Sequence, residues 1–162
     1  MAVTSGCGLL TGGPDAGPLG GGTTDETWQT CTVSIPDHQH AMGFTVLRNP
    51  SEHPAHLTDL SLVGAKNVRM VEAVVLDIVD HTTVGIQEWP PGTVVGTQAW
   101  AARTAYDEAM IAPADKDKNL VIHLETSGIP ASLSGLKISY ELGGDDYSFV
   151  TPTSVDIKDV CF

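Results

Sequence analysis

Hydrophobic and polar residues alternate strictly between positions 136 and 142, which is the pattern of a half-buried β-strand. Leu136, Ile138, Tyr140 and Leu142 fall on one face of this strand, and polar residues occupy the other face. We therefore expect the apolar face to lie in a core and the polar face to lie at the surface.

A turn and a returning strand follow. Gly143-Gly144-Asp145-Asp146 favours a tight turn because glycine and aspartate tolerate positive φ angles, and residues 147–150 then complete a hairpin. Further apolar or alternating runs, bounded by Pro, Gly, Asn or Asp, predict strands at residues 28–35, 42–48, 57–63, 68–79, 82–87, 120–125 and 154–160. This pattern predicts an all-β fold, an immunoglobulin-like antiparallel β-sandwich of seven or eight strands that spans residues 28–162.

The segment between Gly96 and Met110 fits two interpretations. Trp100, Ala101 and Ala105 fall near helical spacing in an Ala-rich stretch, so a short helix or an irregular edge strand both remain open. The Pro-rich sequence before it predicts a surface loop over residues 88–99.

Residues 1–27 differ in character from the rest of the chain. Residues 8–27 are rich in Gly and Pro and contain almost no bulky side chains, so ordering them would cost backbone entropy without compensating burial. We expect a disordered, flexible tether that precedes the folded domain.

The charge balance narrows the function classes. Eight Lys and Arg residues against 20 Asp and Glu residues give a formal net charge of -12, which removes the electrostatic attraction that nucleic-acid binding requires. No apolar run approaches the roughly 18 to 20 residues that a membrane-spanning helix needs. We expect neither a nucleic-acid partner nor a membrane span.

We expect two of the three cysteines to share one role and the third to have another. Cys31 falls in the first predicted strand and Cys161 lies next to the last residue, so a disulfide between them would join the terminal strands. Such a bond implies an oxidising compartment outside the cytoplasm. Cys7 is the remaining cysteine, and it lies in a segment without a strand or helix pattern.

Thr4-Ser5-Gly6-Cys7 resembles the end of the signal box of bacterial lipoproteins, in which the cysteine receives a lipid. The resemblance implies lipid attachment at Cys7, a membrane anchor and a location at the outer face of the cell membrane. Thr4 departs from the family pattern, which has Leu, Val or Ile at that position, and the charged and apolar parts of a signal peptide are missing from this sequence.

The runs 44–49 and 57–63, together with the Tyr140 hairpin, resemble uncharacterised extracytoplasmic β-sandwich domains of lipoproteins from high-GC Gram-positive bacteria. The resemblance covers roughly residues 31–161. It implies a β-sandwich in the cell envelope and attaches no activity to it.

Two histidine-rich segments are the strongest candidate for chemistry. Imidazole nitrogens bind zinc and copper, and a thioether favours Cu(I). If the two segments meet at one edge of the sandwich, they form a copper or zinc site with the ligands His38, His40, Met42, His53 and His56. Solvated loop histidines are the alternative interpretation.

No catalytic motif is present in the sequence: it has no nucleophile elbow, no phosphate-binding glycine loop and no His-Glu-x-x-His zinc helix. Trp89, beside Pro90 and Pro91, is a candidate for a binding loop or for the cap of a core edge. We expect a non-enzymatic, tethered binding module or accessory subunit with an envelope protein as partner, and a copper or zinc carrier as the alternative.

Overall fold

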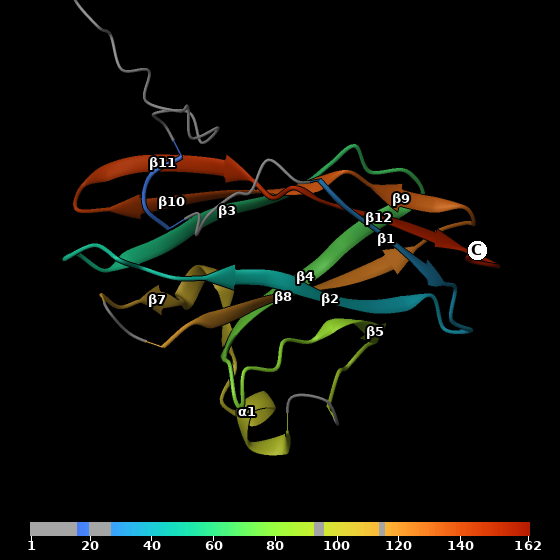
Figure 1. Ribbon diagram of the computed structural model, residues 1–162, viewed down its shortest axis with the longest axis horizontal. Helices are drawn as coiled ribbons and strands as arrows, with labels where there is room; N and C mark the ends of the chain where they lie inside the picture. Colours follow the sequence, from blue (N-terminus) through green and yellow to red (C-terminus); the bar gives the residue numbers. More distant parts are fainter. Residues whose placement is uncertain (1–15, 20–26, 93–95, 114–115) are drawn as a thin grey trace, which may run out of the picture.

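The computed structural model describes residues 16–19, 27–92, 96–113 and 116–162. Its strands form two layers, with a short helical segment below one of them (Figure 1). The described strands are β1 (Trp28–Val33), β2 (Gln39–Leu47), β3 (Ala55–Val63), β4 (Val68–Asp77), β5 (Gly85–Glu88), β6 (Thr104–Ala105), β7 (Met110–Ile111), β8 (Lys118–Thr126), β9 (Ala131–Leu133), β10 (Gly135–Leu142), β11 (Asp145–Val150) and β12 (Thr153–Lys158). The helical elements are α1 (Thr97–Ala101) and the 3-10 turn η1 (Tyr106–Glu108).

One layer is a five-stranded sheet with the order β5-β2-β8-β4-β6. The other layer contains a four-stranded sheet, β11-β10-β3-β7, and a three-stranded sheet, β1-β12-β9. These two sheets continue into each other, because only Ser134 separates β9 from β10 and only two residues separate β11 from β12. At this junction the Thr151 N–H donates to the Leu136 carbonyl at 2.9 Å.

The main core lies between the two layers. Leu136, Ile138 and Tyr140 of β10 and Leu120 and Ile122 of β8 are all buried in one cluster. The strict alternation in β10 therefore arises as predicted. Its apolar residues face the core, and its polar residues Lys137 and Glu141 are exposed. The prediction of an all-β sandwich is confirmed.

The five-stranded sheet is buried on its outer face as well. Ala41, Val74, Leu76, Val84 and Val121 form a second cluster there, against which Trp89 and Trp100 pack. The segment around α1, which follows β5, lies beside this face (Figure 1). Consequently β8, which the sequence predicts to alternate, has both faces buried over most of its length.

The predicted hairpin turn is confirmed. Leu142 pairs with Asp145, so Gly143 and Gly144 alone form the connection, with φ angles of 65° and 91°. Residues without a Cβ adopt such angles at little steric cost, which explains the two glycines.

The short elements differ from expectation. The described strands number twelve, where the sequence predicts seven or eight; the three-residue β9 and the two-residue β6 and β7 are among the strands outside the predicted ranges. Between Gly96 and Met110 the structure combines both predicted alternatives, because α1 and η1 alternate with β6 and β7. Strands this short carry no periodicity that the sequence could display.

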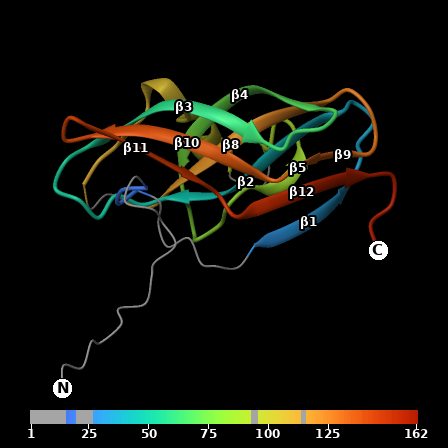
Figure 2. The same cartoon turned by 90° about the horizontal axis from the view of Figure 1, so that it is seen from above.

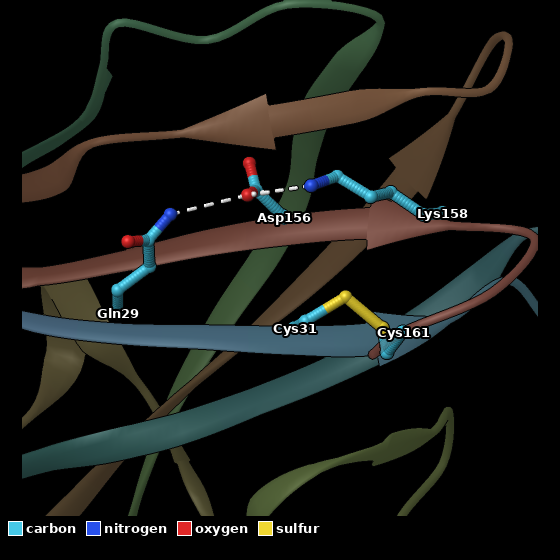
Figure 3. The surroundings of a disulfide bond; sticks show 5 residues. All are labelled: Gln29, Cys31, Asp156, Lys158 and Cys161. Atoms are coloured by element: carbon cyan, nitrogen blue, oxygen red, sulfur yellow. Dashed lines mark hydrogen bonds and ion pairs between the residues drawn. A yellow bond between two sulfur atoms is a disulfide. The ribbon is translucent and has the colours of Figure 1, made fainter.

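The first and last strands are neighbours. β1 pairs in parallel with β12, and Cys31 lies opposite Asp156 in that register (Figure 2). Cys31 and Cys161 form the predicted disulfide, with 5.8 Å between their Cα atoms (Figure 3). Beside it, Asp156 accepts a hydrogen bond from Gln29 and pairs with Lys158.

Part of the predicted tether is packed against the domain. Leu19 is fully buried in the main core, which contradicts the expectation that residues 8–27 bury no side chain. The Tyr140 hydroxyl donates to the Ala16 carbonyl at 2.8 Å and accepts the Leu19 N–H at 3.0 Å. The Leu19 side chain and the Tyr140 hydroxyl therefore hold residues 16–19 against the domain. The amino-acid composition alone does not indicate such contacts.

Candidate functional site

A cleft lies between the carboxyl end of β4, the start of β8 and the segment from α1 to β7. We call it the α1–β4 cleft, and its volume is about 630 Å³. Val75, Leu76 and Ala109 contribute apolar surface to its lining. Concave, largely apolar surfaces with a few polar groups are the usual form of ligand sites in proteins.

Charged and apolar side chains share the rim of this cleft. Lys118 pairs with Asp77 at 2.6 Å, and Glu108 adds a second, exposed carboxylate. Met110 and Val79 remain 55% and 49% exposed there. Exposed apolar groups beside carboxylates suit a partner that offers an apolar side chain next to a basic one.

Trp89 lies outside this cleft. Its ring stacks on His123 with 4.4 Å between centroids and meets Trp100 edge-on at 5.2 Å. The Arg103 guanidinium lies 4.5 Å above the Trp100 ring. Trp89 is half-buried and caps the second cluster, so the structure favours the core-edge alternative, while a binding role of Trp89 stays a prediction.

The predicted histidine ligands occupy two ends of the sandwich. His40 and Met42 are buried residues of β2, which corrects the prediction that both histidine segments are exposed loops. His53 lies beyond the other end of β2, where its carbonyl accepts a hydrogen bond from Asn49. Seven residues separate His40 from the end of β2 at Leu47, which corresponds to about 20 Å along a strand.

The five predicted metal ligands are therefore not assembled into one site. His56 is exposed on β3, which belongs to the opposite layer from β2. Among the residues that the structure describes, no three His, Cys, Asp or Glu side chains lie close enough together to hold a metal ion. The spacing of the histidines in sequence could not reveal that a whole strand separates the two pairs.

Two histidines, His40 and His123, are buried within the five-stranded sheet. His123 contacts the Gln39 side chain through Nε2, while its Nδ1 lies 3.5 Å from Glu72 without a hydrogen bond. Burial lowers the pKa of His123 below its ordinary value, and Glu72 offsets part of this effect. Burial also lowers the pKa of His40, and the neighbouring His38 lowers it further.

We expect the free energy of unfolding to fall as the pH decreases from about 7.5 to about 5.5. The lowered pKa values mean that the unfolded chain takes up protons on His40 and His123 below about pH 6.5 while the folded chain still excludes them. Urea unfolding at both pH values measures the loss. The variant His40→Leu should reduce this pH dependence, and His56→Gln, which changes an exposed histidine, is the matched control. An equal pH dependence in His40→Leu and the unchanged chain would contradict the assignment.

Cys7 lies outside the described residues, so its predicted lipid attachment remains a prediction. No helix within the described parts of the chain is long and apolar enough to cross a membrane.

Fold and site together define a disulfide-bonded all-β sandwich with an open cleft beside its helical segment. No known family model matches the chain, and no curated protein is detectably similar to it.

Proposed function

We propose that this chain is a non-catalytic binding module of the bacterial cell envelope. In this proposal a lipid on Cys7 anchors it to the outer face of the cell membrane, and the α1–β4 cleft contacts an envelope protein. The observation that carries the proposal is the cleft itself, whose rim keeps Met110 and Val79 exposed to solvent. Exposed apolar side chains that line a concave surface are typical of sites that bind a protein partner.

Two further features support this function. The Cys31–Cys161 disulfide suits a protein that works outside the reducing cytoplasm. The net charge of -12 and the exposed Glu108 favour a partner with basic residues around an apolar side chain. A metal carrier is not proposed, because the predicted ligands lie at both ends of β2.

Photo-crosslinking at the cleft tests the contact with a partner. A benzoylphenylalanine in place of Met110 should yield one dominant crosslinked protein in intact cells. Val150 in β11 offers the matched control, because its exposed fraction of 47% is close to the 55% of Met110 and β11 lies at the opposite edge of the four-stranded sheet from β7. Equal products from both positions, or none from Met110, would refute the cleft as the contact surface.

Lipid attachment is tested separately. The variant Cys7→Ser should move the protein from the membrane fraction to the soluble fraction, and the N-terminal peptide of the unchanged protein should carry the mass of the lipid. An unmodified Cys7 in the isolated protein would remove the anchor from the proposal and leave the cleft experiment unaffected.

A further inference from the structure

Residues 16–19 lie in a binding site that belongs to the sandwich. Tyr140 and Tyr147 of the β10–β11 hairpin form its walls, with their rings 5.4 Å apart, and we call it the Tyr140 socket. The hairpin is separated from its occupant by more than a hundred residues in sequence. The contacts are therefore tertiary and resemble those between a protein and a short peptide.

The socket recognises both backbone and side chain. The Tyr140 hydroxyl binds the two ends of a tight turn, the carbonyl of Ala16 and the N–H of Leu19. The Leu19 side chain is fully buried. Gly17 is required between them, because a Cβ there would lie 2.2 Å from the Tyr140 hydroxyl oxygen and 2.6 Å from the Tyr147 ring.

We propose that the Tyr140 socket is a peptide-binding site that residues 16–19 of the same chain fill, and that residues 16–19 of a second copy can fill in exchange. The site is distinct from the α1–β4 cleft and does not depend on the function proposed for it. The linker from the segment to β1 is residues 20–27, which include Gly20-Gly21-Gly22. A connection of this length in sequence corresponds to an effective concentration in the millimolar range, so a second copy competes when copies are crowded at about that concentration.

The variant Gly17→Val should empty the socket. Its added side chain collides with Tyr140, and Gly17 also has a φ angle of +60°, which L side chains rarely adopt. Gly96→Ala is the matched control, because Gly96 has a φ angle of +77° but no atom within 4 Å of the added Cβ. The control imposes backbone strain without touching the socket.

A fluorescent peptide of residues 12–23 measures access to the socket. We expect it to bind Gly17→Val with a Kd of about 10 to 100 μM, and to bind the unchanged chain and Gly96→Ala at least about 30-fold more weakly. The same peptide with Leu19→Ala should lose about tenfold or more in affinity. A folded Gly17→Val variant without saturable binding at about 1 mM peptide would overturn the proposal.

A cleaved chain covers the case in which Gly17→Val does not fold. A protease site is placed within residues 20–26 of the otherwise unchanged protein and is cut after folding. The N-terminal fragment should then exchange with the labelled peptide. A fragment that dissociates and leaves no peptide-binding site would overturn the proposal.

Mixing two variants tests the second copy as occupant. Tyr140→Phe lacks the hydroxyl that holds Ala16 and Leu19, so it releases an intact segment, while Gly17→Val offers an intact socket. Sedimentation should show a 1:1 heterodimer in the mixture at about 100 μM each and monomers in the separate samples. Monomers in the mixture, when the free peptide does bind, would overturn exchange between copies.

Discussion

Removal of the Cys31–Cys161 disulfide is expected to lower the free energy of unfolding by about 5 kcal/mol. The bond joins residues 130 positions apart, and a closed loop of that size removes much of the conformational entropy of the unfolded chain. It also holds β1 beside β12, which is the strand that pairs with β1 in the described part of the chain. Loss of the bond should therefore expose both terminal strands to local unfolding.

Urea unfolding of the double variant Cys31→Ser and Cys161→Ser, compared with the unchanged protein, measures this effect. Cys7→Ser serves as the control for the loss of a cysteine that the disulfide does not use. A difference below about 1 kcal/mol would contradict the expected role of the bond.

The second large effect is expected at Asn119, which is fully buried in β8. Its side-chain amide donates to the Gly43 and Thr45 carbonyls at 3.0 Å each, and its oxygen accepts the Val84 N–H at 2.9 Å. Gly43 and Thr45 belong to the irregular part of β2, where the ladder with β8 shifts between Met42 and Thr45, and Val84 directly precedes β5. Asn119 thus replaces the backbone partners that the shift removes.

The variant Asn119→Ala should cost about 4 kcal/mol, because two buried backbone groups and one partly buried group lose their hydrogen bonds at about 1 to 3 kcal/mol each. Equilibrium urea unfolding measures the loss. Gln29→Ala, which removes one exposed hydrogen bond to Asp156, should cost below about 1 kcal/mol. Similar values for the two variants would show that burial does not raise the cost at Asn119.

A strand is most readily predicted from the sequence where one of its faces lies in a core and the other in water. β10 is the clearest case, with Leu136, Ile138 and Leu142 buried and Lys137 exposed. The disulfide could also be predicted. The strand assignment places Cys31 in the first strand, and Cys161 lies next to the last residue, so a bond between them joins the two terminal strands.

The remaining features depend on contacts between distant segments. His40 looks like a loop residue because polar neighbours precede it, yet it pairs with Leu124 and is buried between the layers. The cleft likewise forms only when the α1 segment folds back against the end of β4. Periodicity describes one element at a time, so neither could be predicted from it.

If the proposed lipid on Cys7 is present, the contact of Ala16 with Tyr140 limits how far the domain can stand from the membrane. From an anchor at Cys7 to Ala16 the chain has nine residue steps, a reach of at most about 30 Å, whereas the path to Trp28 would allow about 70 Å. With the segment seated, the strongly acidic sandwich would stay close to the lipid headgroups. The Tyr140 hydroxyl, by holding this segment, would then limit the distance from the membrane at which the domain contacts neighbouring proteins.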